Sequence, residues 1–223
     1  MTLTRISALI AAAGALFTLT GCSSSDGGDP TENAPSNLMT YNGNSVNEAG
    51  EPTSLFTYYA ENSDVPVPYA SAAVPSLTTA DVGKRVAVRY FVGSGSTITV
   101  LNTRLVPTAT LAMADTQDAE ANNQPVDVVS ISRQGPYINL YAKLPAEGTH
   151  TYSVLCDRNT YGTSQPHIYI SVTPSTESSG YSLSTLSCYD ISSVWNSGAT
   201  QSVVVHINNT AYAGAPTTFT FRK

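Results

Sequence analysis

Apolar and polar residues alternate with a period of two along most of this chain, which is the pattern of β-strands. The clearest case is residues 137–144, where apolar residues at even positions alternate with Tyr137, Asn139, Tyr141 and Lys143. Successive side chains of such a segment point to opposite faces of a sheet. No stretch of ten or more residues combines helical spacing with helix caps. The pattern therefore predicts an all-β protein.

The alternating segments fall into two groups. The first group contains five segments, at 38–45, 54–60, 65–70, 84–92 and 97–106. Turn residues separate them, as in the Gly-Ser-Gly-Ser run at 93–96. Five short strands in roughly 70 residues are typical of a small barrel. We therefore expect a small OB-like five-stranded barrel domain at residues 38–106.

The second group contains seven segments, at 126–133, 137–144, 150–157, 167–173, 181–191, 202–207 and 217–221. Seven short strands with turn signals between them favour a β-sandwich, which we place at residues 124–223. Residues 107–123 are rich in Thr, Ala, Asp, Glu and Asn and lack sustained alternation. We interpret them as an interdomain segment with one helical turn near 111–115.

The chain begins with an export signal. Arg5 precedes an apolar run at 6–19 that is too short to span a bilayer as a helix. The run closes on Leu19-Thr20-Gly21-Cys22, which resembles the bacterial lipobox. The alternative is an ordinary cleaved signal with an unrelated cysteine.

That resemblance implies a lipoprotein signal peptide at residues 1–21. Cys22 would then carry a diacylglycerol on its sulfur and a third acyl chain, such as palmitate, on its amino group. Two or more acyl chains anchor a protein stably. Residues 22–37 are polar and small, so we expect a flexible tether between this anchor and the folded body.

The net charge of the chain bears on its partners, and the residue after Cys22 bears on its location. The full chain carries a formal net charge of −6, and removal of residues 1–21 with Arg5 makes it −7. An acidic chain with no Lys/Arg cluster argues against nucleic acid as a partner. Ser23, not Asp, follows Cys22, and by resemblance to Gram-negative lipoproteins this favours the outer membrane. Whether the protein faces the periplasm or the cell surface stays open.

The order of the strand segments resembles the NigD-like lipoproteins of Bacteroidales. The resemblance covers 38–223, and its segments are DVGKRV at 81–86, then PVDVVSI, YINLYAKL, IYISV, LSCYDI, VVVHI and TFTFRK. It implies an OB-like amino-terminal barrel, a carboxy-terminal β-sandwich and an association with bacteriocin immunity. The family supplies no catalytic residues to carry over to this chain.

The sequence contains no sign of catalysis. His150, His167 and His206 lie in three different strand segments. A hairpin around Tyr161 would place His150 and His167 at opposite ends, so we expect no metal site. The chain also lacks a Gly-x-Ser-x-Gly elbow, an HExxH motif and an Asp-rich calcium loop. We therefore expect a protein that is not an enzyme and has no cofactor.

Two cysteines remain once Cys22 is used by lipid. Cys156 and Cys188 could form a disulfide in an oxidising compartment. Two strands of one sheet that are separated by a third strand lie about 10 Å apart, which is too far for a disulfide. A bridge therefore requires the strands of Cys156 and Cys188 to face each other across the sandwich. We favour the alternative, in which both are small buried hydrophobic residues.

Aromatic residues are the best candidates for binding. The chain has 13 Tyr, with Tyr137 and Tyr141 on one strand face, Tyr169 on another strand, and Trp195 in an expected loop at 192–200. An exposed row would suit sugar rings or a partner protein. The alternative, which we favour, is that these rings cover sheet faces and domain contacts.

These observations predict a lipid-anchored, non-catalytic envelope protein at the outer membrane. Its function would be that of a binding or protective module, with immunity to a bacteriocin as one form of protection. The alternatives are a structural or accessory lipoprotein of an envelope complex, or a carbohydrate-binding surface lipoprotein. The partner, whether protein, peptide or glycan, stays unknown from the sequence.

Overall fold

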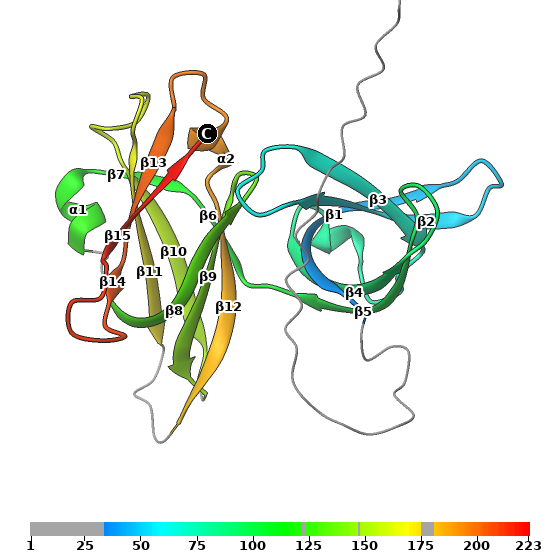
Figure 1. The fold of residues 1–223 in the computed structure, drawn as a ribbon, viewed down its shortest axis with the longest axis horizontal. Coiled ribbons are helices and arrows are strands. Elements are labelled where there is room, and N and C mark those ends of the chain that lie inside the picture. Colours follow the sequence, from blue (N-terminus) through cyan, green and yellow to red (C-terminus); the bar gives the residue numbers. More distant parts are fainter. Residues whose placement is uncertain (1–33, 122–123, 147, 175–180) are drawn as a thin grey trace, which may run out of the picture.

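The computed structural model describes residues 34–121, 124–146, 148–174 and 181–223. They form two lobes that lie side by side (Figure 1), an N-terminal lobe of residues 34–106 and a C-terminal lobe of residues 107–223. Cys22 and the signal peptide lie outside the described residues. Among the described residues, no helix has the length and apolar character needed to cross a membrane.

The N-terminal lobe is one antiparallel sheet with the strand order β3-β2-β1-β4-β5. Its elements are β1 (Ser36–Val46), β2 (Pro52–Tyr59), β3 (Pro66–Ala72), the 3-10 helix η1 (Thr79–Asp81), β4 (Arg85–Val92) and β5 (Ile98–Leu105). All five predicted strands are therefore confirmed. The predicted closed barrel is not, because among the described residues the two edge strands are joined by one isolated bridge, between Ala70 and Thr97.

One face of this curled sheet forms the core of the lobe. Val86, Val88 and Tyr90 alternate inward along β4, as the sequence predicts. They pack with Met39, Tyr41, Phe56, Leu77 and Ile98. Burial of such side chains contributes about 1.5 to 3 kcal/mol each, so this cluster holds the sheet in its curled form.

The C-terminal lobe consists of two five-stranded sheets, with the orders β15-β13-β11-β10-β7 and β14-β8-β9-β12-β6. Its elements are β6 (Thr108–Thr110), β7 (Ala112–Ala114), α1 (Thr116–Ala121), β8 (Pro125–Gln134), β9 (Tyr137–Pro145), β10 (His150–Asp157), β11 (His167–Pro174), β12 (Ser182–Asp190), α2 (Ser192–Trp195), β13 (Ser202–His206), β14 (Asn208–Asn209) and β15 (Thr218–Arg222). The seven predicted strands are all present. The total of seven is wrong, since the two sheets contain ten strands within the described residues.

Residues 107–123 account for most of that difference. They were expected to connect the domains, but β6 pairs in parallel with β12 and β7 in parallel with β10, so the segment adds one strand to each sheet. The helical turn expected near 111–115 is also wrong, because β7 occupies 112–114 and the helix α1 follows it. Strands of three residues are too short to show alternation and are defined by backbone pairing to distant strands.

The two sheets pack face to face through apolar side chains. Ile168 and Ile170 of β11 belong to the same buried cluster as Ile138 and Leu140 of β9. The sheet containing β8, β9 and β12 lies nearer the N-terminal lobe, whereas α1 lies at the end of the molecule away from it (Figure 1). The outer faces of the two sheets therefore have different surroundings, since the one that contains β12 faces the N-terminal lobe and α1 covers part of the other.

Candidate functional site

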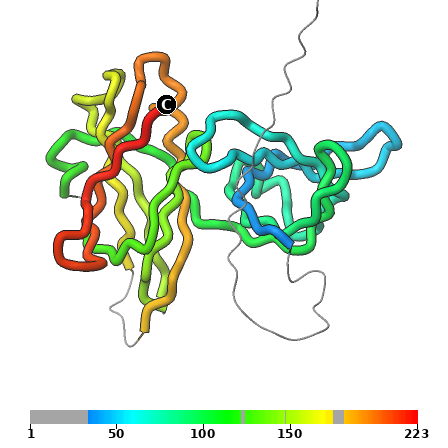
Figure 2. Tube along the Cα trace, in the orientation of Figure 1, coloured from blue at the N-terminus to red at the C-terminus, as the bar shows by residue number. Residues whose placement is uncertain are grey.

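The lobes meet where the connection between β2 and β3 reaches the turn between β8 and β9 (Figure 2). Backbone hydrogen bonds join these two turns, from Asn62 N–H to the Arg133 carbonyl at 2.8 Å and from Gly135 N–H to the Ser63 carbonyl at 2.9 Å. Glu61 and Gln134 add an isolated antiparallel bridge. The contact is therefore partly an extension of sheet pairing across the junction.

Trp195 lies at this junction and is buried, with 2% of its surface exposed. Its indole Nε1–H donates to Asp64 Oδ1 at 2.7 Å. The same oxygen accepts from the Arg133 guanidinium at 2.7 Å, and that guanidinium lies 4.3 Å from the Trp195 ring centroid. Trp195 is part of α2, not of a loop as predicted, and its ring is used to join the lobes.

Tyr137 lies on the other side of the same junction. The fully buried Arg85 of β4 stacks over its ring at 4.4 Å and donates to Gln134 Oε1 at 2.9 Å. Tyr59 of the N-terminal lobe approaches the Tyr137 ring with a centroid separation of 6.5 Å. Burial lowers the pKa of Arg85. Tyr137, like Trp195, contributes its ring to the lobe contact.

A pocket of about 410 Å³ opens at the junction. It is lined by Tyr59, Asp64, Pro136, Trp195, Asn196 and Lys223. Three of its polar groups already have partners within the protein: Asp64 Oδ1 accepts from Arg133 and from Trp195, and Lys223 Nζ donates to the Ser197 carbonyl. We therefore interpret this pocket as part of the joint between the lobes.

The remaining predicted aromatics do not extend this cluster. Tyr169 is 6% exposed and stacks on His206, with ring centroids 4.4 Å apart and planes 9° from parallel. Tyr141 is 39% exposed and belongs to β9, in the other sheet. The four predicted binding aromatics thus form no common exposed row. Tyr137 and Trp195 instead cover the contact between the lobes, and Tyr169 covers part of a sheet face, as the alternative favoured from the sequence predicts.

Cys156 and Cys188 are both free and buried, so the disulfide considered from the sequence is absent. Their strands, β10 and β12, do lie in opposite sheets. Cys156 points into the core between the sheets. Cys188 instead points toward the N-terminal lobe, where its thiol donates to Asn139 Oδ1 at 3.1 Å and lies close to Arg85. The side chains therefore point in different directions and cannot be bridged.

A second concave region, which the sequence did not reveal, lies on the N-terminal lobe. It is a groove of about 630 Å³ between the segment 72–76 and the edge strand β5, lined on that side by residues 97–103. A hydrogen bond from Ala70 N–H to the Ser96 carbonyl, 2.9 Å, closes one end. The hydroxyls of Ser76 and Thr103, 2.9 Å apart, close the other.

The walls of this groove are strand edges. β5 pairs with β4 on one side, and within the described residues the isolated bridge at Thr97 is its backbone pairing on the other. The opposite wall bonds away from the groove, since Ala73 N–H donates to the Pro52 carbonyl and Val74 N–H to Ser54 Oγ. An edge of this kind is a template for an added strand.

Exposed apolar side chains surround the β5 edge. Leu101 and Leu105 of β5 are 36% and 42% exposed. Leu101 also lines the groove. Apolar side chains next to an open strand edge suit a polypeptide partner, because backbone pairing and apolar contact can form together.

Acidic and metal-ligating side chains bear on the chemistry that the two pockets could support. Within the described residues, no group of three or more His, Cys, Asp or Glu side chains is placed to hold a metal ion. Asp81 beside the groove-bearing sheet is used internally: a backbone bond from Thr78 and a bond from Lys84 lower its pKa to about 2. It therefore acts as a capping group for η1.

Comparison with known proteins identifies the fold. No protein-family model matches the sequence, and no curated protein matches it. Among solved structures, a protein of unknown function (DUF1344) from Bacteroides vulgatus is similar with a TM-score of 0.59 at 12% identity, covering 84% of this chain and 89% of that one.

Two further solved structures carry more informative names. A candidate lipoprotein of Bacteroides fragilis has a TM-score of 0.54 at 13% identity, covering 83% of this chain and 94% of its own. A NigD-like immunity protein of Bacteroides caccae has a TM-score of 0.52 at 14% identity, covering 78% and 85%. The resemblance to NigD-like lipoproteins is therefore confirmed at the level of the fold.

Proposed function

We propose that this protein is a lipid-anchored, non-catalytic envelope protein that binds an extended segment of a partner protein in the groove of its N-terminal lobe. The observation that carries the proposal is the groove itself, a cavity of about 630 Å³ bounded by an unpaired strand edge. An extended segment placed along β5 would gain main-chain hydrogen bonds from the edge and specificity from pockets for alternate side chains.

The groove has the dimensions for such a segment. Residues 97–103, which are Thr97 and the first six residues of β5, line one wall, and this corresponds to a length on the order of 20 Å at about 3.3 Å per residue. Entry requires the Ser76–Thr103 hydrogen bond to open. That bond is exposed, and a typical hydrogen bond of this kind contributes only about 1 kcal/mol.

The burial of the predicted aromatics favours a protein partner over a sugar. Sugar-binding platforms need exposed rings, and both Tyr169 and Trp195 are buried. The large exposed side chains of β5 itself are instead aliphatic, namely Leu101 and Leu105. Aliphatic surface next to a strand edge is suited to a peptide.

The names of the structural neighbours agree with this function. One is a lipoprotein candidate and another an immunity protein. By our proposal this chain has the same kind of task, in which capture of a toxic protein at the envelope protects the cell. The N-terminal lobe would then be used as an OB-like binding domain, and the C-terminal two-sheet lobe as its support.

Photochemical cross-linking in intact cells tests the groove. A photoreactive amino acid at Leu101 should capture a partner, whereas one at Leu183, on β12 of the other lobe, should not. Leu183 is the more exposed of the two, at 53% against 36%, so non-specific capture would favour the control. Equal capture at both positions, or capture at neither, would contradict the proposal.

A matched pair of substitutions sharpens this test. Leu101→Lys places a charge on the strand edge, a device by which natural proteins prevent strand addition, and should abolish co-purification of the partner that the cross-link identifies; co-purification is the measure of capture for both variants. Leu183→Lys makes the same chemical change on the other lobe and should leave capture unchanged. Retention of the partner by the Leu101→Lys protein would show that the groove is not the binding site.

The anchor has its own test. Cys22→Ser removes the sulfur that the lipobox resemblance assigns to lipid, so the variant should not incorporate labelled palmitate and should leave the membrane fraction unless its signal stays uncleaved. The net charge of the body is negative, and anionic lipid surfaces attract basic segments. Palmitate labelling of Cys22→Ser equal to that of the parent would contradict the anchor.

A further inference from the structure

Two histidines that are far apart in the sequence meet on the outer face of the sheet β15-β13-β11-β10-β7. His206 Nε2 lies 3.1 Å from His167 Nδ1. The parallel pairing of β11 with β13 brings them together, because it places Tyr169 beside His206 and His167 one row further along. Alternate residues of both strands point into the core, so these side chains share the opposite face.

The surrounding structure holds both rings in place. The His206 ring is stacked on Tyr169. The backbone N–H of His167 donates to Thr160 Oγ1 at 2.9 Å, and that hydroxyl donates to the Asp157 carbonyl at 2.9 Å. The histidine pair is therefore built on a fixed strand end and not on a mobile loop.

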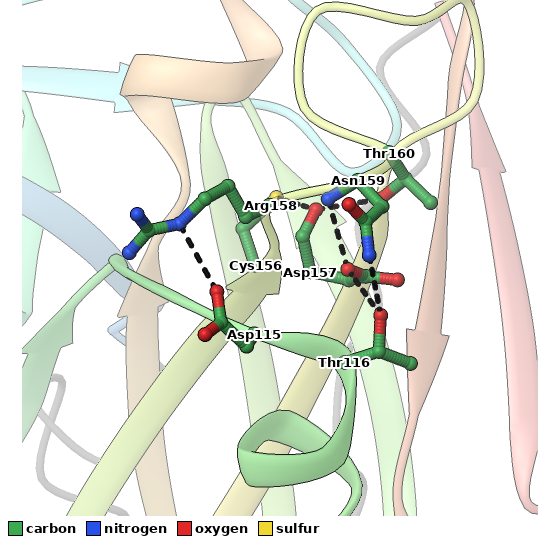
Figure 3. Close-up of polar contacts among 7 residues, drawn as sticks. All are labelled: Asp115, Thr116, Cys156, Asp157, Arg158, Asn159 and Thr160. Carbon is green, nitrogen blue, oxygen red and sulfur yellow. Dashed lines mark hydrogen bonds and ion pairs between the residues drawn. The ribbon is translucent and has the colours of Figure 1, made fainter.

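Figure 3 shows how the turn after β10 is tied to the start of α1. Asp157 Oδ1 accepts from the Thr116 hydroxyl at 2.8 Å and from Asn159 N–H at 3.0 Å. Arg158 pairs with Asp115 at 3.4 Å on the neighbouring side. These bonds position α1, and with it Glu120, over the sheet face that carries the histidines.

The electrostatic surroundings of the pair act in opposite directions. Burial and then the neighbouring His167 lower the pKa of His206, whereas Glu120 raises it. Burial raises the pKa of Tyr169, and Glu120 and Asp157 raise it further. Both carboxylates are therefore close enough to act on a charge placed here.

We propose that His167 and His206 form a two-histidine site for a divalent late transition metal, Cu²⁺ or Zn²⁺. Imidazole nitrogens at 2.0 to 2.1 Å from an ion, at square-planar or tetrahedral angles, lie about 2.9 to 3.4 Å apart. The observed separation of 3.1 Å falls in that range. Without a metal ion the two rings share a hydrogen bond, in which one of the two nitrogens carries a proton. To bind the ion, the ring that donates this bond carries its proton on its other ring nitrogen instead.

The expected site is open and exchangeable. Within the described residues no third His, Cys, Asp or Glu completes a metal-binding group, so water fills the remaining positions. Cu²⁺ should bind more tightly than Zn²⁺, following the usual order for nitrogen ligands. The buried thiols do not compete, because burial raises the pKa of both Cys156 and Cys188 to about 11 and metals bind the thiolate.

The site is independent of the groove. α1 and the histidine face lie at the end of the molecule away from the N-terminal lobe (Figure 1). Metal binding can therefore be measured on the purified protein with no partner present. Failure of the metal site would leave the groove untouched, and failure of the groove would leave the metal site untouched.

Calorimetric titration of the full-length protein in detergent with Cu²⁺ and with Zn²⁺ tests the proposal. We expect saturable binding of one Cu²⁺, and at least about tenfold weaker binding in H167Q and in H206Q, since even outer partners of metal ligands contribute 10- to 100-fold. His150 provides the control, because its ring is at the opposite end of β10, bonded to the Pro145 carbonyl. H150Q should bind as the parent does.

Electron paramagnetic resonance of the Cu²⁺-loaded parent gives a second measurement that needs no variant. Two imidazole nitrogens should be visible as hyperfine splitting, and one should be lost in H206Q. Absence of nitrogen coupling in the parent, or affinity in H167Q and H206Q equal to that of H150Q, would overturn the proposal.

Discussion

The two arginines buried at the lobe junction, one from each lobe, are stabilised in different ways. Arg133 of the C-terminal lobe is 1% exposed and pairs with Asp64 of the N-terminal lobe at 2.7 Å. Arg85 of the N-terminal lobe is fully buried, and its acceptors are neutral: Thr40 Oγ1, the Leu38 carbonyl and Gln134 Oε1. Each guanidinium also stacks on one aromatic ring.

This difference indicates which side of the junction holds the lobes together. Removing Asp64 leaves the buried Arg133 guanidinium without its charge partner, which is destabilising, and the 46% exposure of the Asp64 side chain lets water offset part of that loss. The desolvation of Arg85 is offset only by neutral hydrogen-bond acceptors and by one aromatic ring. An apolar replacement removes these favourable contacts but also removes the unfavourable desolvation of the charge. The Asp64 side should therefore be essential and the Arg85 side replaceable.

Loss of Asp64 should have the largest effect. Asp64→Ala leaves the Arg133 guanidinium and the Trp195 Nε1–H without their shared acceptor. Arg133 keeps its bond to the Gly135 carbonyl and water can reach the vacated site, so we expect a loss of about 2 to 3 kcal/mol in the free energy of unfolding, measured by urea denaturation. Asp127→Ala is the control, because it breaks the exposed ion pair with Lys143 at 3.1 Å and should lose at most about 1 kcal/mol. Equal losses would mean that the junction pair has no special weight.

A methyl group at Gly135 should have the next largest effect. Gly135 has φ +56°, and an added Cβ would lie 2.6 Å from the Tyr59 ring of the other lobe. Gly162 has φ +78° with open space around it, so Gly162→Ala should lose only the conformational term of about 1 to 2 kcal/mol. Gly135→Ala should lose clearly more in the same denaturation experiment. Identical losses would show that the junction adapts freely.

Replacement of Arg85 should have a smaller effect than replacement of Arg133. In Arg85→Met an apolar side chain of similar length occupies a site with no carboxylate, and we expect a change of about 1 kcal/mol or less. Arg133→Met leaves Asp64 without its cation and should be the more destabilising of the two by urea denaturation. The reverse order would contradict the distinction drawn between the two sides.

The smallest expected effect at neutral pH concerns Cys188, which lies beside Arg85, because its contribution changes only at alkaline pH. Burial raises the pKa of this thiol from 9 to about 11, with Arg85 acting in the opposite direction. The folded state therefore keeps the thiol proton that the unfolded chain loses above pH 9, and the stabilisation present below pH 9 declines as the pH rises toward 11. Cys188→Ala should make this alkaline decline shallower in unfolding measurements between pH 8 and pH 11. A decline parallel to that of the parent would argue against the raised pKa.

Sequence reasoning was most successful where the signal is local. Alternation over five or more residues predicted twelve strands, and all twelve are present. It failed for β6 and β7, whose three residues each are defined by pairing with β12 and β10. Trp195 and Tyr137 were recognised as unusual aromatics, but their role at the junction depends on arginines from other segments.

The binding regions could not be found from local pattern. The groove exists because the edges of β3 and β5 approach at Ala70 and Thr97 and then separate. The histidine pair exists because β11 and β13, 39 residues apart at His167 and His206, lie side by side in parallel. Neither feature has a motif, since neither is made from neighbouring residues.

The amino-acid sequence by itself determined the long β-strands and their division between two lobes, because period-two alternation is visible in consecutive residues, and for the same reason the lipobox pattern predicts a lipid anchor at Cys22. The tertiary structure alone decided that Cys188 points away from Cys156, that Asp64 joins Arg133 and Trp195 across the lobes, and which strand edges stay open. The physical reason is that hydrophobic periodicity specifies which face of a strand is buried, whereas partners across a fold depend on how distant strands pack.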